Sequence, residues 1–142
     1  MKPRFALAFA LSAALGVSAA HAAATETWTV DPVHSTAQFT ARHFGIVPVI
    51  GTIPILSASV TLNSGSQIPA AVSAVLDASK VDTHNDMRDG DLRSPHYFNA
   101  AVTPDIRFVS NKIAGTDAKS FTIAGDLTMH GQTHPITLNA QV

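Results

Sequence analysis

The sequence of 142 residues has nine Lys and Arg, ten Asp and Glu and no cysteine. The lack of cysteine excludes disulfides, thiolate metal sites and cysteine nucleophiles. Two of the cations, Lys2 and Arg4, lie in a leader segment; without it, seven cations face ten acids, a net charge of −3. An acidic chain of this kind is not expected to bind nucleic acid.

Residues 1–22 are predicted to be a secretory signal peptide. Lys2 and Arg4 precede an uncharged apolar run over residues 5–20, and Ala20-His21-Ala22 is a small-x-small cleavage site. A transmembrane anchor is the alternative, but the run is shorter than the roughly 20 residues that a spanning helix needs. We therefore expect one domain over residues 23–142, located in the periplasm or secreted, with no membrane span.

Period-two alternation is the main pattern of the remaining chain, and it predicts antiparallel strands. It appears over residues 37–41, 58–62 and 106–108, and most clearly over residues 121–142, where it predicts a β-hairpin with its turn at Gly131-Gln132. Six or more strands are expected, in an all-β fold that is closed or packed on itself. Many inward positions carry Ala, Val or Gly, which leaves two alternatives open: a barrel with room for an elongated apolar ligand, or a tighter ordinary core.

A charged insert over residues 81–98 interrupts the strand pattern. Asn85 is a candidate helix N-cap, and Asp86 and Asp89 lie near the positive end of the short helix that it would begin. Arg88 and Arg93 supply forked donors suited to phosphate or carboxylate. The neighbouring carboxylates, Asp82, Asp86, Asp89 and Asp91, either orient these arginines toward an anion or neutralise them, and a merely solvated connection is the third reading.

Two other function classes are weighed against binding. A hydrolase or other enzyme is disfavoured because the chain has no G-x-S-x-G elbow, no phosphate-cradling glycine loop and no H-E-x-x-H motif. A metal-binding role would use surface histidines, of which His130 and His134 flank the last predicted turn. Two solvent-facing strand-end histidines are the simpler interpretation of that pair. For His34 and His43, in the first strands, a structural bond to backbone or carboxylate is favoured over ligand contact.

Several motifs together resemble those of the YceI-like family, which comprises exported, lipocalin-like, polyisoprenoid-binding bacterial proteins. The matching stretches are Trp28-x-x-Asp31-x-x-His34-Ser35, Phe39-x-x-Arg42-His43-x-Gly45, Asp82-Thr83-x-Asn85-x-x-Arg88-Asp89-x-x-Leu92-Arg93-Ser94-Pro95-x-x-Phe98, Pro104-x-Ile106-x-Phe108-x-Ser110 and Gly125-Asp126-Leu127-Thr128. They cover nearly all of residues 23–142. One local departure is Asp91, which stands where the family has a histidine.

The resemblance implies an antiparallel lipocalin-like β-barrel with a helical insert near its mouth. Such a barrel would hold a polyprenyl-type lipid or a quinone-like amphiphile, with no cofactor, no metal and no covalent chemistry. The expected apolar lining is Phe39, Leu62, Leu76, Phe108, Leu127 and Leu138, and the expected polar mouth is Arg42, His43, Asp82, Asn85, Arg88 and Arg93.

The family barrel normally continues with further strands, whereas the sequence stops at Val142. We therefore expect a barrel that is incomplete at its C-terminus, with an exposed edge to be covered by a partner chain, by a lipid or by nothing. The sequence leaves open whether the protein is a monomer or a homodimer.

Overall fold

The computed structural model describes residues 24–43 and 45–142, and of His43 it describes the backbone alone. The predicted signal peptide, residues 1–22, lies outside this part of the chain. The elements in chain order are β1 (Thr25–Thr29), β2 (Ala37–His43), β3 (Val47–Ile53), β4 (Ile55–Asn63), β5 (Pro69–Asp77), a 3₁₀ turn (Ala78–Lys80), α1 (Asp86–Arg93), β6 (Asp105–Asp117), β7 (Ser120–Met129) and β8 (Gln132–Ala140).

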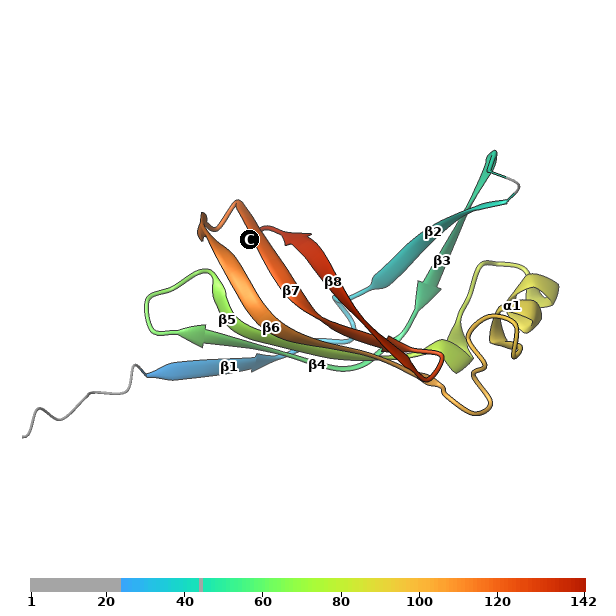
Figure 1. The fold of residues 1–142 in the computed structure, drawn as a ribbon, viewed down its shortest axis with the longest axis horizontal. Coiled ribbons are helices and arrows are strands. Elements are labelled where there is room, and N and C mark those ends of the chain that lie inside the picture. Colours follow the sequence, from blue (N-terminus) through green and yellow to red (C-terminus); the bar gives the residue numbers. More distant parts are fainter. Residues whose placement is uncertain (1–23, 44) are drawn as a thin grey trace, which may run out of the picture.

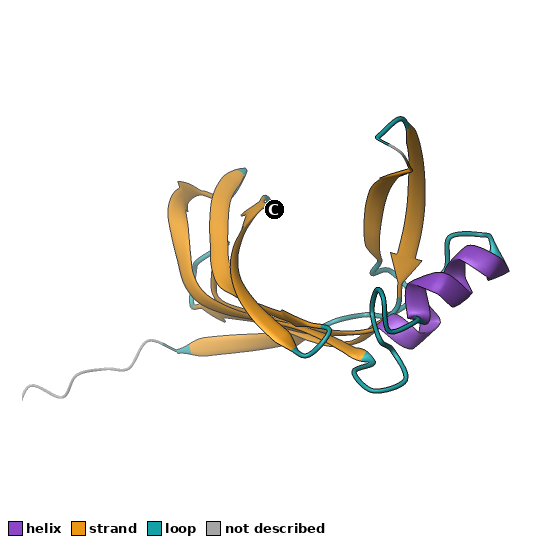
Figure 2. Ribbon diagram, turned by 45° about the vertical axis from the view of Figure 1, so that its right-hand side comes forward, coloured by secondary structure: helices purple, strands orange, loops and turns teal. Residues whose placement is uncertain are grey.

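The strands form two antiparallel sheets, which confirms the predicted fold class. Six strands pair in the order β1-β4-β5-β6-β7-β8, and β2 and β3 form a separate hairpin. Figures 1 and 2 show the six-stranded sheet as a curved wall, with the β2–β3 hairpin standing apart from it near α1. Over the described residues, 24–43 and 45–142, this sheet does not close into a barrel, and β1 and β8 are its two edges.

Pro54 makes the corner between the hairpin and the main sheet. On one side of it Thr52 pairs with Asp82, and on the other Ile55 pairs with Leu76. Proline is suited to such a junction because it cannot donate to a continuous ladder. One chain segment, β3 followed by β4, therefore contributes to both sheets.

The predicted C-terminal hairpin is confirmed, with its turn one residue earlier than expected. Met129 pairs with Gln132, so the turn consists of His130 and Gly131, with φ of 53° and 70°. Positive φ at both central residues is the type I′ geometry, whose twist matches the flanking strands. The sequence pointed to the glycine; it did not show that His130 adopts the left-handed conformation as well.

The registers define which side chains share a face of the main sheet. Trp28 pairs with Val60, Phe108 with Leu127, and Ile123 with Leu138, so their side chains line one side of the wall. This side of the sheet is here called the concave face, and its larger apolar residues are Trp28, Val60, Leu62, Val72, Leu76, Ile106, Phe108, Phe121, Ile123, Leu127, Ile136 and Leu138. Five of the six residues predicted as apolar lining belong to it.

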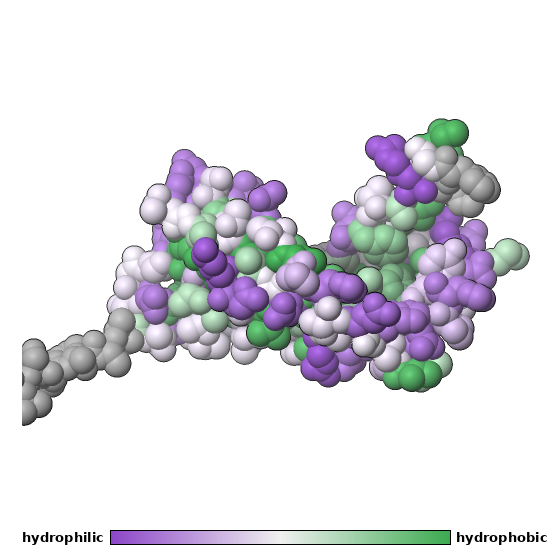
Figure 3. Space-filling view, in the orientation of Figure 1, coloured by the Kyte–Doolittle hydropathy of each residue, from purple (hydrophilic) through white to green (hydrophobic). Residues whose placement is uncertain are grey.

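Two buried clusters cover only part of this face. One lies at the base of the wall, where Ile53, Val81 and Ile106 pack with the insert, and the other joins Phe108, Phe121 and Ile123 across β6 and β7. Beyond them the concave face stays open: Trp28 is 58% exposed and Leu138 is 40% exposed. The space-filling view shows the hollow between wall and hairpin, with apolar surface on both of its sides (Figure 3).

Candidate functional site

The charged insert is a folded element held by its own polar groups. Asn85 caps α1 as predicted, its side-chain oxygen accepting a hydrogen bond from the Arg88 N–H at 3.0 Å. The Asp89 carboxylate accepts two hydrogen bonds from Thr83, one from the Thr83 backbone N–H at 2.9 Å and one from the Thr83 hydroxyl. Both residues are buried, at 5% and 3% exposure. The insert is therefore not a solvated connection.

Arg88 completes this arrangement, here called the Thr83 lock (Thr83, Arg88 and Asp89). Its Nε donates to the Thr83 hydroxyl oxygen and its Nη2 to the Thr83 carbonyl, both at 2.7 Å. The Thr83 hydroxyl donates to Asp89 and accepts from Arg88, so it joins the two charged groups. This hydroxyl bond is the main cause that lowers the pKa of the Asp89 carboxyl below its usual value.

Arg93, the other arginine of the insert, also bonds to backbone. Its Nη1 donates to the Val81 carbonyl at 3.4 Å. Asp82 accepts from the His84 N–H at 2.7 Å and is itself exposed. The charged side chains of the insert thus bind groups of their own loop. Of the three interpretations this is closest to self-neutralisation, although the arginines donate to backbone carbonyls and to a threonine hydroxyl.

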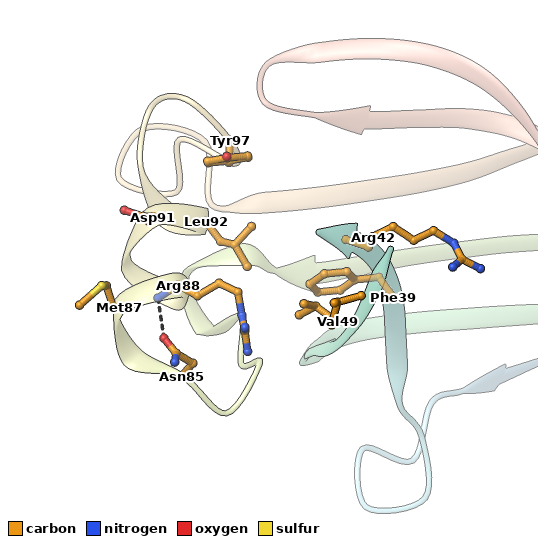
Figure 4. A pocket seen from close by; sticks show the side chains of 11 residues that line it. Phe39, Arg42, Val49, Asn85, Met87, Arg88, Asp91, Leu92 and Tyr97 are labelled. Atoms are coloured by element: carbon orange, nitrogen blue, oxygen red, sulfur yellow. Dashed lines mark hydrogen bonds between the residues drawn. The ribbon is translucent and has the colours of Figure 1, made fainter. Parts of the chain in front are cut away.

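A cavity of about 560 Å³ lies between the β2–β3 hairpin and α1. Phe39 and Val49 point from the hairpin toward the helix, whereas the Arg42 guanidinium points away from it (Figure 4). The Phe39 ring meets Phe98 edge to face, with centroids 6.5 Å apart. The lining residues are Phe39, Ala41, Arg42, Val47, Val49, Asn85, Met87, Arg88, Asp91, Leu92 and Tyr97.

This cavity, here called the hairpin cavity, brings together four of the predicted site residues, namely Phe39, Arg42, Asn85 and Arg88. Asp82 and Arg93 do not line it. Sequence reasoning missed Val47 and Val49, because Pro48 and Ile50 beside them obscure the alternation of β3. It also missed Met87 and Tyr97, which are 82% and 58% exposed.

A second cavity of about 690 Å³ lies over the concave face at β1, β4 and β5. Its apolar lining includes Trp28, Val30, Val60, Leu62 and Val142, and Glu26 and Asp31 also border it. We call it the trough. Leu62 is the one predicted lining residue found here. Trp28 was noticed only as part of a motif, yet it presents the largest exposed apolar side chain in this cavity.

The other predicted lining residues lie in less open surroundings. Phe108 is buried, Leu76 packs against the basal cluster, and Leu127 packs against both clusters while bordering a smaller cavity of about 240 Å³. These residues lie on the concave face next to the trough, where they pack in the buried clusters and do not line the trough itself.

Four histidines of the described chain have a nearby polar partner for their side chain, namely His34, His84, His130 and His134. His34 bonds the Asp31 carboxylate at 2.7 Å, the main cause of a lowered pKa of that carboxyl, but it is exposed. His130 bonds the Tyr97 carbonyl and His134 the Gln132 side chain. Among residues 24–43 and 45–142, no three His, Asp or Glu side chains cluster as metal ligands would. Nor does that part hold a helix long and apolar enough to cross a membrane.

The family model described as "YceI-like domain" matches residues 28–142, which is most of the chain. The chain belongs to the YceI-like family. Protein YceI of Escherichia coli O6:H1 is 30% identical over 109 residues, covering 77% of this chain and 56% of that protein. A UPF0312 protein of Shewanella denitrificans is 29% identical over 134 residues, covering 94% of this chain and 70% of that protein.

Two solved structures have a fold similar to that of this chain. A YceI protein of Campylobacter jejuni matches with a TM-score of 0.63 at 27% identity, covering 79% of this chain and 66% of that one. BcnA of Burkholderia cenocepacia matches with a TM-score of 0.71 at 23% identity, covering 80% and 70%, and this likeness concerns the fold alone. The chain spans 56% of the length of several curated relatives that it matches.

Proposed function

We propose that the protein is an exported binding protein that holds an elongated apolar molecule, of the isoprenoid lipid or quinone-like class, along its concave face. The observation that carries the proposal is the trough, where a 58% exposed Trp28 and its apolar neighbours border about 690 Å³ of open volume. Pockets that bind small molecules are concave, mostly apolar and about 300–1,000 Å³ in size.

Burial of ligand carbon against this face supplies the affinity. Each buried CH₂ group contributes about 0.8 kcal/mol, so a ligand gains by extending from the trough along the concave face. Leu62 lies in the trough, and Leu138 lies on the same face at the far edge of the sheet, 40% exposed. An extended apolar chain fits this geometry better than a compact polar ligand. No step of the proposal involves covalent chemistry or a cofactor.

A polar head group would be recognised near the hairpin cavity. Arg42 is exposed there, and its side chain makes no hydrogen bond or ion pair with the residues that the structure describes, whereas Arg88 and Arg93 donate to Thr83 and Val81. Among the predicted mouth residues we therefore assign the leading role to Arg42. Arg88 contributes those donors that Thr83 does not use.

The test combines native mass spectrometry with fluorescence of Trp28, the sole tryptophan. The exported protein is first examined for a bound species that organic solvent extracts. After extraction it is titrated with a polyprenyl alcohol. Because Trp28 borders the trough, its emission should shift to shorter wavelength as the probe covers it.

A matched pair of variants locates the binding surface. Leu62→Asn should weaken binding about tenfold or more, because it removes one apolar contact worth roughly 1.5–3 kcal/mol. Val109→Asn is the control, since Val109 is 58% exposed on the opposite face of the wall. Equal weakening by both variants, or no emission shift at any probe concentration, would contradict the proposal.

A further inference from the structure

A cavity of about 240 Å³ lies at the β7–β8 turn and shares no lining residue with the trough or the hairpin cavity. It is here called the turn cavity. Its lining residues are Leu127, Met129, His130, Gln132 and His134, all of them from β7, β8 and the turn that joins them. One thioether and two imidazoles therefore border a single small cavity, and the proposed function uses none of them.

Strand pairing places Met129 and His134 on the same side of the β7–β8 hairpin. Met129 pairs with Gln132, and two residues further along each strand Leu127 pairs with His134. Met129 and His134 are therefore diagonal neighbours on the concave face. Diagonal neighbours lie about 7–8 Å apart between Cα atoms, within reach of long side chains. Because His130 borders the same cavity from the turn, an ion in the turn cavity is within reach of all three side chains.

Each histidine of the turn cavity uses one ring nitrogen in a hydrogen bond, and its other nitrogen bonds nothing in the part of the chain that the structure describes. Nδ1 of His130 donates to the Tyr97 carbonyl, so in the neutral imidazole Nε2 has a free lone pair. Nε2 of His134 donates to the Gln132 side-chain oxygen at 3.3 Å, which leaves Nδ1 with the lone pair. Metal-binding histidines donate their other ring nitrogen to an oxygen in the same way, which fixes the tautomer and the ring orientation.

His130 occupies a position that a different residue would suit better if only the turn mattered. Both turn residues have positive φ, 53° at His130 and 70° at Gly131. Type I′ turns strongly favour Asn, Asp or Gly before the second glycine. Departures from the locally preferred residue occur at functional sites more than elsewhere. The turn geometry therefore does not account for the imidazole, whereas a ligand in the turn cavity would.

We propose that the turn cavity binds one copper(I) ion through the Met129 sulfur, Nε2 of His130 and Nδ1 of His134. Thioether sulfur is a soft ligand that selects copper(I), and imidazole also suits copper. Residues 127–134 contain no Asp or Glu, so the site lacks the carboxylate oxygens that hard cations such as Mg²⁺ and Ca²⁺ require. The site is independent of what the trough binds, because the two cavities have no residue in common.

Competition with a chromophoric copper(I) chelator tests the site. The exported full-length chain is added to copper(I) bicinchoninate in ascorbate, and the loss of the chelator's absorbance gives the number of ions bound and their affinity. One ion per chain is expected, since the chain has no cysteine to supply a thiolate site. Native mass spectrometry of the same samples checks the stoichiometry.

A pair of methionine variants tests the thioether. Met129→Leu removes the sulfur but keeps a side chain of similar volume, so it should retain the fold and weaken copper(I) binding about tenfold or more. Met87→Leu is the matched control, because Met87 is 82% exposed in α1 and does not border the turn cavity. It should leave the affinity unchanged.

A pair of histidine variants tests the imidazole. His130→Asn places the preferred Asn-Gly pair in the turn, so the hairpin should be retained while copper(I) binding falls about tenfold or more. His84→Asn is the control, since His84 is the other exposed histidine with positive φ, at 60°, and lies in the insert. Absence of bound copper(I), or affinities of Met129→Leu and His130→Asn no lower than those of their controls, would overturn the proposal.

Discussion

The charged insert and the trough reverse the usual expectation for polar and apolar surface. In the insert, charged groups are satisfied from within: Asp89 and Arg88 both bond Thr83, and Arg93 bonds the Val81 carbonyl. In the trough, apolar groups are left uncovered, most clearly Trp28. The charged groups of the insert thus have partners inside the protein, whereas apolar side chains of the trough are exposed to solvent.

The difference separates structural residues from candidate binding residues. A buried polar group whose bonds are all made inside the protein has little left to offer a ligand, and removing it leaves its partners unpaired. An exposed apolar side chain contributes little to folding and gains by being covered. Stability should therefore depend on the insert, and ligand binding on the trough.

The largest expected effect is the loss of the Thr83 lock. Asp89→Ala leaves a buried N–H and a buried hydroxyl without their acceptor, which should lower the free energy of unfolding by about 3 kcal/mol. The matched control is Asp91→Ala, an exposed carboxylate in the same helix, with an expected change within about 0.5 kcal/mol. Urea denaturation measures both. Equal values would mean that the insert is not held through Asp89.

A smaller effect is expected where the hairpin meets the insert. A Cβ on Gly51 would lie 2.5 Å from the Phe39 ring and 2.7 Å from the Thr83 methyl. Gly51→Ala should therefore destabilise the protein by about 1–3 kcal/mol, because this packing has no room to give.

The control substitution is expected to change stability in the opposite direction. Gly90 lies in α1 with nothing within 4 Å of its Cβ position, so Gly90→Ala should stabilise by about 0.5–1 kcal/mol through helix propensity. Thermal unfolding followed by circular dichroism compares the two. Destabilisation by both would indicate that α1 itself, and not the contact with Phe39, is sensitive.

Local sequence pattern predicted the elements with regular alternation and missed the rest. The β7–β8 hairpin followed from alternation and a turn glycine, and the start of α1 followed from the capping chemistry of Asn85. β3 was not recognised, because Pro48 and Gly51 interrupt its pattern and Ile50 adds an apolar residue on the opposite face. That the hairpin stands apart from the main sheet depends on the Pro54 corner and on pairing between distant strands, which no local pattern contains.

The sequence named several residues that line the hairpin cavity and the trough, but it did not show how these residues are arranged. Asp89 was expected beside the helix start as a partner for arginine or for the helix dipole, but its carboxylate bonds Thr83, six residues earlier. Five of the six apolar residues predicted as lining share one face of the main sheet, since strand alternation sets the face, whereas Phe39 lies on the separate hairpin. Which of them remain uncovered depends on how far the packed clusters extend, and that is a tertiary property.

The smallest expected effect concerns the loss of stability at acidic pH. It compares two carboxylates whose pKa values are both lowered in the folded protein. Asp89 is buried and bonds Thr83, whereas Asp31 is exposed and bonds His34. A carboxyl whose pKa is depressed in the folded state stabilises the fold above its unfolded-state pKa, and this contribution is lost as pH falls through the folded-state value. Stability should thus decline below the usual carboxyl pKa of 3.8. Asp89→Asn should reduce that decline in urea midpoints measured across acidic pH, and Asp31→Asn should leave it nearly unchanged, because an exposed pair is screened by solvent. The opposite ranking would place the acid sensitivity in the loop before β2 and remove the insert as the region on which stability depends.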